Sequence, residues 1–279
     1  MTLRNIQAAY EEACRLEIDA LKPGNVHVFA DGHHMTVEQF MISARVSSGP
    51  LTDPALPVGR RILAAVRATR DAVGTNTNLG IILLCAPLMR AGMLPGGASQ
   101  GNLGAVLEGL DMADTSAIFE AIALASPGGL GSADAHDVRD APQVLILDAM
   151  AAAADRDRIA RQYVTHFEDV FGIGMAALHA SLAGGESGMW PTVLTYMNFL
   201  ASFPDSHVAR KYGPKTAEAV QDEARSVRDQ LAATTDEKER LELLLRFDRS
   251  LKARQINPGT SADLTVACLL VHLLGGQLA

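Results

Sequence analysis

The sequence predicts an all-α protein, on three observations. Apolar residues recur at helical spacing along most of the chain, aromatic residues make up only 5%, and no strand-type alternation of polar and apolar residues persists. There is also no internal repeat and no linker-like tract, and 279 residues are enough to bury a substantial core. We therefore expect a single compact domain, residues 1–279, of roughly a dozen helices with buried central members.

The helices can be placed in order. The first covers residues 3–20, where apolar residues from Leu3 to Leu16 share one face, and Pro23 and Gly24 end it. Thr36 and Gln39 make a capping box for a helix that runs to about residue 47. A break rich in proline follows it. The later helices are expected at residues 60–73, 76–93, 101–111, 115–125, 143–154, 156–182, 190–202, 206–211, 215–231, 236–253 and from about residue 261 to the C-terminus.

Composition excludes several classes of function. The net charge is −8 with no basic tail, which argues against a nucleic-acid partner. The N-terminus has no signal-peptide pattern, and the apolar runs are far shorter than the ~20 residues that a bilayer requires. Cys14, Cys85 and Cys268 lie far apart in apolar helical patterns, typical of buried thiols in a reducing compartment. We expect a cytoplasmic protein without a membrane partner.

Four polar junctions, each just before an apolar helix, are the places where chemistry could occur. A helix start has free N–H groups and a partial positive charge, so it suits an anion such as phosphate. The first junction is "KPGNVH", residues 22–27, with Glu17 upstream and Asp31, His33 and His34 downstream. A helix end followed by a solvated loop explains this junction slightly better than a functional site does. In the functional interpretation Lys22 binds phosphate, and Glu17 or Asp31 binds a metal ion or a sugar hydroxyl.

The second junction is "GTNTNLG", residues 74–80. Asn76 or Thr77 can cap the following helix, but one cap leaves Asn78 unexplained in the first turn. Because an amide both donates and accepts hydrogen bonds, a pair of asparagines suits a ribose or the edge of a nucleobase. Here the functional interpretation is the favoured one.

The third junction is the glycine-rich, polar stretch 126–142. Gly128 and Gly129 would allow close approach of a ligand to the backbone, and nearby aspartate and histidine side chains could serve Mg²⁺ or a proton shuttle. The stretch matches neither a Walker A loop nor a Rossmann fingerprint, so a surface loop explains it equally well.

The fourth junction is "NPGTSAD", residues 257–263. Asp263 lies in the first turn of the last helix, where the helix dipole alone accounts for a carboxylate. The stretch from Asp205 to His207 could join the same group, although Asp205 is equally suited to cap a helix.

Together, these elements resemble the triphosphoribosyl-dephospho-CoA synthase family. "EIDALKPGNV" resembles its Glu-x-x-x-x-x-Lys-Pro-Gly element, and "GTNTNLG" its Asn-Thr-His-Lys-Gly element. "DSHVARKYG" and "NPGTSADL" resemble its two C-terminal elements, in the right order over about residues 10–275. Three positions depart from the pattern: Asn78 and Leu79 replace the His-Lys pair, and His34 stands where the family has an aspartate.

The resemblance implies an all-helical transferase that joins the ribose of ATP to 3′-dephospho-CoA and releases adenine, with Mg²⁺ holding the triphosphate. The catalytic candidates are Glu17, Asp31, His33 and His207. The candidates for binding the nucleotide and acceptor are Lys22, Asn25, Asn76, Thr77, Asn78, Gly128, Gly129 and Ser261. The candidate metal ligands are Asp31, Asp205 and Asp263.

Two alternatives remain open. A paralogue could use the same scaffold on another nucleotide or phosphorylated precursor, in the synthesis of a pterin- or furan-type one-carbon cofactor. A helical nucleotide-binding protein without catalysis is the other. In each case the expected partners are a nucleotide and a small molecule, and a homodimer is a further expectation.

Overall fold

The computed structural model describes residues 2–29, 36–127 and 136–275. Over these residues the chain forms fourteen α-helices and one short π-helix, η1, without a β-strand, so the predicted all-α class is confirmed. The elements are α1 Leu3–Asp19, α2 Val37–Thr52, α3 Val58–Val73, α4 Leu79–Gly92, α5 Gln100–Glu108, α6 Met112–Ala125, α7 Ile146–Ala153, α8 Arg158–Val164, η1 Val170–Gly174, α9 Met175–Ala183, α10 Trp190–Ser202, α11 Ser206–Tyr212, α12 Pro214–Ala233, α13 Glu237–Ala253 and α14 Gly259–Leu273.

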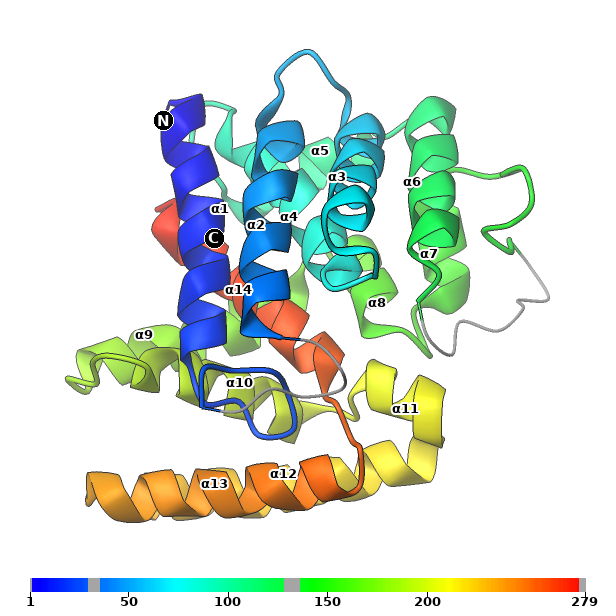
Figure 1. Cartoon of the computed structure of the whole chain (residues 1–279). Helices are drawn as coiled ribbons and strands as arrows, with labels where there is room; N and C mark the ends of the chain where they lie inside the picture. Colours follow the sequence, from blue (N-terminus) through cyan, green and yellow to red (C-terminus); the bar gives the residue numbers. More distant parts are fainter. Residues whose placement is uncertain (1, 30–35, 128–135, 276–279) are drawn as a thin grey trace.

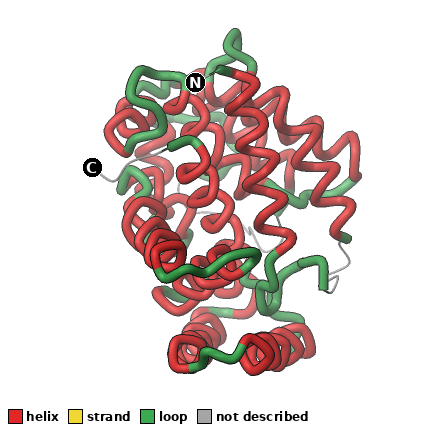
Figure 2. Tube along the Cα trace, turned by 90° about the vertical axis from the view of Figure 1, so that its left-hand side faces the viewer, coloured by secondary structure: helices red, strands yellow, loops and turns green. Residues whose placement is uncertain are grey.

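Helices α1, α2, α3 and α6 stand side by side, and each packs on the next (Figure 1). Helices α4 and α14 pass through the middle of the molecule and pack on each other. Both are buried on nearly every face, as their uniformly apolar sequences require. The α12–α13 hairpin lies across one end (Figures 1 and 2). It forms a second apolar cluster with α10, separate from the main core around α4 and α14.

Local signals set several helix boundaries as predicted. The capping box of Thr36 and Gln39 is present at the start of α2. Gly74 ends α3 in the left-handed region at φ 74°, where a side chain would be strained. Helix α2 continues to Thr52, however, through Pro50 in its last turn, so the predicted break after residue 47 is wrong.

The single helix expected at 156–182 is also wrong. It is divided into α8, η1 and α9, and the chain turns between the first two at His166 and Phe167, with φ values of 50° and 61°. Phe167 is fully buried, and its amide N–H donates to the carbonyl of Gln162 at 2.8 Å. Burial of an aromatic ring therefore offsets a backbone conformation that helical spacing alone cannot reveal. None of the helices in the described part of the chain is both long and apolar enough to cross a membrane.

Candidate functional site

A cavity of about 1210 Å³ opens between the start of α4 and the starts of α8, α11 and α14. It is larger than the usual pocket for one small ligand, which occupies roughly 300–1,000 Å³. Glu17, Asn25, Asn76, His207 and Asp263 all line it. Described parts of the third junction, residues 126–127 and 136–137, line it too, so the structure brings residues from all four junctions together. Thr77 lies on the same wall.

Glu17 reaches the cavity from α1 and forms an ion pair with Lys22, with 3.1 Å between Oε1 and Nζ. Glu17 is 4% exposed and Lys22 is fully buried. Burial raises the pKa of the Glu17 carboxyl, and the charge of Lys22 opposes that rise. Burial likewise lowers the pKa of Lys22, opposed by Glu17. Lys22 also donates to the carbonyl of Val26 at 2.7 Å and does not line the cavity, so its placement suits a partner for Glu17 better than the predicted phosphate contact.

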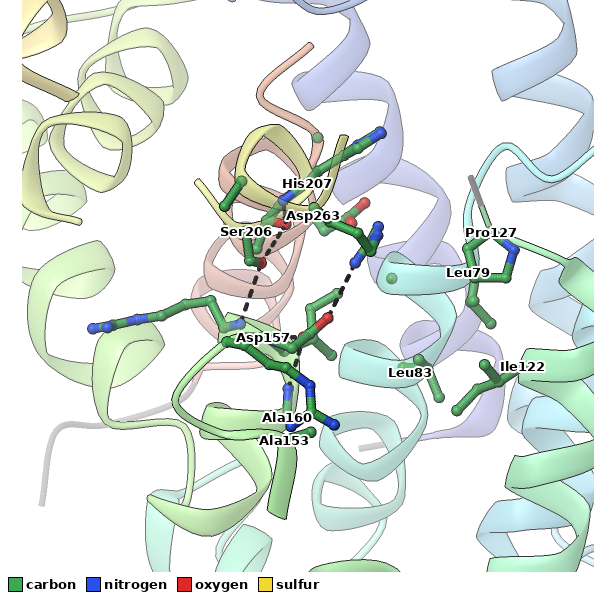
Figure 3. Close-up of a pocket in the computed structure, with 18 of the residues that line it drawn as sticks. Leu79, Leu83, Ile122, Pro127, Ala153, Asp157, Ala160, Ser206, His207 and Asp263 are labelled. Atoms are coloured by element: carbon green, nitrogen blue, oxygen red, sulfur yellow. Dashed lines mark hydrogen bonds and ion pairs between the residues drawn. The ribbon is translucent and has the colours of Figure 1, made fainter. Parts of the chain in front are cut away.

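Asp263, in the first turn of α14, points into the cavity (Figure 3). Its carboxylate has no hydrogen-bond or ion-pair partner within the described residues. Burial raises its pKa well above the ordinary value, and the negative charges of Glu17 and Asp205 raise it further. A cation or a developing positive charge bound at this position would favour the ionised form of Asp263.

Two motif glycines allow these side chains to lie where they do. A methyl group on Gly80 would overlap the carboxylate of Asp263, and one on Gly259 would overlap the ring of His207. The glycines of "NTNLG" and "NPGT" are therefore required for close packing at the cavity, in addition to any role in turns.

The two asparagines before α4 have different surroundings. Asn76 lines the cavity, and its Oδ1 accepts from the amide N–H of Leu79 at 3.1 Å. The N-cap residue of α4 is Asn78, so the prediction of Asn76 or Thr77 at that position is wrong. Asn78 is 5% exposed, lies 3.4 Å from the hydroxyl of Ser47 on α2, and does not line the cavity. Its polar side chain is thus explained by a contact between helices, whereas the amide of Asn76 remains next to the ligand space.

Asp205 occupies the helix start that was expected to hold an anion. Its Oδ1 accepts from the backbone N–H groups of His207 and Val208, and its Oδ2 accepts from both the N–H and the hydroxyl of Ser261 at 2.8 Å. Burial nevertheless raises its pKa. These bonds account for Asp205 and Ser261 as a clamp between α11 and α14, without a metal ion or a phosphate.

Two arginines at the cavity are held in place by ion pairs with aspartates. Arg210 lies 3.2 Å from Asp157, and both line the cavity. Arg158 makes two 2.7 Å contacts with Asp169 and stacks on the ring of Phe203, 4.1 Å from its centroid. The chain therefore supplies cationic groups at this end of the cavity, held in fixed orientations.

A buried polar cluster supports the "KPGNVH" loop from behind. Asp248 on α13 accepts from the amide N–H of Gly24 at 2.9 Å and lies 3.2 Å from Lys252 and 3.3 Å from the ring of His27. Asn25 donates to Asn257 at 2.8 Å, which joins this loop to the one before α14. Burial alone would raise the pKa of Asp248, but the hydrogen bond to His27 and its other partners lower it.

Asp248 and Asp157 are among the residues around the cavity that were not predicted. Asp248 lies within an amphipathic helix, and Asp157 within a stretch that was expected to be helical throughout, so neither gave a local signal. Four predicted site residues, Asp31, His33, Gly128 and Gly129, lie outside the described residues. The described part contains no group of three or more His, Cys, Asp and Glu side chains arranged to hold a metal ion.

Comparison with known proteins identifies the family. The model of the CitG family, described as ATP:dephospho-CoA triphosphoribosyl transferase, matches residues 3–279. Among solved structures, the chain resembles a provisionally assigned triphosphoribosyl-dephospho-CoA synthase from Archaeoglobus fulgidus, with a TM-score of 0.64 and 24% identity. That similarity covers 83% of this chain and 96% of the other, and at this identity it shows a shared fold. No curated protein matches the chain. From its third residue to its last, the chain belongs to the CitG family of ATP:dephospho-CoA triphosphoribosyl transferases, and it is a transferase.

Proposed function

We propose that the protein catalyses, in this cavity, the transfer of the 5-triphosphoribosyl group of ATP to the 2′-hydroxyl group of 3′-dephospho-CoA, with release of adenine. The observation that carries this proposal is the meeting of Glu17 and Asp263, from opposite ends of the chain, in a cavity with room for more than one ligand. The family assignment supports the same reaction. No observation favours the one-carbon cofactor or non-catalytic alternatives over it.

The reaction needs no net acid or base. The bond between C1 of the ATP ribose and N9 of adenine breaks, and a bond from C1 to the acceptor oxygen forms. The proton lost by the acceptor hydroxyl is the one that adenine gains. The chain must therefore stabilise positive charge on C1 and carry one proton between two substrates.

Glu17 is suited to the first task, because Lys22 supports its negative charge and its carboxylate lines the cavity. His207 is suited to the second, since an imidazole can both accept and release a proton near neutral pH. Asn25, Asn76 and Thr77 would bind ribose hydroxyls or the base through their amide and hydroxyl groups. Arg210 and Arg158 would face the phosphates.

Mg²⁺ would enter with ATP, and it usually requires only one or two carboxylates in addition to the substrate phosphates. The residues present fit such an ion, because Asp263 offers a cavity-facing carboxylate that has no other partner in the described chain. We propose Asp263 as its protein ligand. When bound, Mg²⁺ would neutralise part of the triphosphate charge.

A cytoplasmic location and a homodimer also remain predictions. Light scattering on the purified protein tests whether it forms a homodimer.

The test is to incubate the purified chain with ATP, Mg²⁺ and dephospho-CoA and to measure adenine by chromatography. Adenine should form together with an equal amount of a product that combines the triphosphoribosyl group and dephospho-CoA by mass. Glu17→Gln should lose activity, whereas Glu12→Gln, at a partly exposed position on the same helix that does not line the cavity, should keep it. Absence of adenine with folded protein, or equal release without the acceptor, would refute the proposal.

A further inference from the structure

The cavity has two chemically different ends. Figure 3 shows Leu79, Leu83, Ile122 and Pro127 on one side, facing Asp157, His207 and Asp263 on the other. We call the first side the apolar end. It is made by Leu79, Leu83, Phe119, Ile122, Ile146 and Met150, and these residues come from α4, α6 and α7.

The apolar end exists because of how three helices pack. Helix α6 packs on α3 and α7, while α4 packs mainly on α3, α5 and α14. All six side chains belong to or pack against the main core, and all but Ile122 are buried there, so the edges that they leave uncovered form this wall of the cavity. Apolar surface next to water is unfavourable, so this end favours an uncharged ligand segment.

The chemistry of the two substrates allows one assignment, which rests on the proposed function. A triphosphate requires cations, and the six residues of the apolar end carry none. The adenine of ATP is bonded to the carbon that reacts, and the adenine of dephospho-CoA is bonded to the carbon next to the one that bears the reacting hydroxyl, so both must stay near Glu17 and Asp263. The pantetheine arm of dephospho-CoA is long and uncharged. It is separated from the reacting hydroxyl by a ribose and a diphosphate, which places it away from the carboxylates.

We infer that the apolar end binds the pantetheine arm of the acceptor, with Ile122 and Met150 as specificity-determining residues. Ile122 is only partly buried by its own neighbours, so part of its side chain is left for a ligand. Met150, on α7, is an adaptable side chain that can follow the shape of the arm.

The test compares Ile122→Asn with Leu124→Asn, a matched change two positions along α6 at a residue that is also partly buried but does not line this cavity. The dissociation constants of dephospho-CoA and of 4′-phosphopantetheine, which is the arm without its nucleoside, are measured by calorimetry, together with the KM for ATP. Ile122→Asn should weaken both arm-containing ligands by about tenfold and leave the KM for ATP unchanged. Leu124→Asn should change none of these values.

Two results in Ile122→Asn would overturn the inference. One is unchanged binding of both arm-containing ligands. The other is a rise in the KM for ATP without weaker binding of those ligands, which would put adenine at the apolar end. Thermal melting checks that each variant folds. If Ile122→Asn does not fold, Met150→Gln gives the same comparison with less change in volume. Failure of the proposed function is distinct, because it appears as absence of adenine release by the unmodified chain while binding of 4′-phosphopantetheine can still be measured.

Discussion

At the scale of single residues, the site depends on carboxylates held where their own charge is unfavourable. Glu17 has a buried lysine as its partner, while Asp263 has only the cavity in front of it and a glycine behind it. Such groups reduce the stability of the empty protein and become favourable when a cation or a cationic centre is bound. Measuring how substitutions of these carboxylates and their partners change the stability of the protein therefore tests the roles proposed for them.

Asp263→Asn should stabilise the ligand-free protein at neutral pH. Because the pKa of Asp263 is raised in the folded state, the folded chain binds a proton that the unfolded chain releases above about pH 3.9. Its cost to stability is thus absent at lower pH, and it grows as pH rises toward the raised pKa by roughly 1.4 kcal/mol for each unit of difference. Melting curves between pH 4 and 8 should show the variant gaining on the parent protein as pH rises, while Asp71→Asn, an exposed change, tracks the parent. A constant difference would contradict this account.

Lys22→Met should be strongly destabilising, since it leaves the Glu17 carboxylate buried without a partner. Loss of one member of a buried ion pair typically costs about 3–5 kcal/mol. Urea unfolding should show a loss of this size, and Glu17→Gln in the same chain should recover much of it. The exposed change Arg15→Met, which breaks contacts with Glu12 and Asp19, is the control and should cost less than about 1 kcal/mol. Equal losses of stability for Lys22→Met and Arg15→Met would contradict the burial of the ion pair between Glu17 and Lys22.

At the scale of elements, helix starts meet at the cavity, but their chemistry differs from one to the next. The start of α14 is neutralised by Asp205 from the chain itself, whereas the start of α4 presents Asn76 and Gly80 to the cavity. The starts of α4 and α14 lie at residues 79 and 259, within three residues of the predicted 76 and 261, and both line the cavity. Which of them is already occupied by a side chain depends on contacts over 56 residues of sequence, in the case of Asp205 and Ser261, and local sequence cannot reveal that.

Gly80→Ala tests the packing of α4 against α14. Alanine is preferred over glycine in a helix by about 1 kcal/mol, but here its methyl group would overlap the carboxylate of Asp263. We expect adenine release to fall by more than about tenfold, because catalytic groups must be held to within a fraction of an ångström. Gly101→Ala on α5, where there is open space, should leave the rate unchanged. A wild-type rate in Gly80→Ala would mean that the position of Asp263 does not matter.

At the scale of the whole molecule, the fold brings residues 17, 76, 207 and 263 to one cavity between two apolar clusters. Periodicity and capping residues predicted the helical class and most helix positions, since both signals are local. They missed the turn at His166 and Phe167, where a fully buried ring accompanies positive φ values that helical spacing does not predict. The apolar end was also beyond reach, because Leu79 and Ile122 look like ordinary core residues until the spacing of α4 and α6 is known.

The central claim is that Glu17 and Asp263 act on the same reaction in one cavity, and a double-mutant cycle tests it most directly. Single-turnover adenine release is measured for the unmodified chain, Glu17→Gln, Asp263→Asn and the double variant, so that chemistry is separated from binding and product release. Each single change should lower the rate by about 100-fold or more, and the double variant should lose much less than the product of the two single losses. Independent, multiplicative losses, or near-normal rates in either folded single variant, would contradict the account.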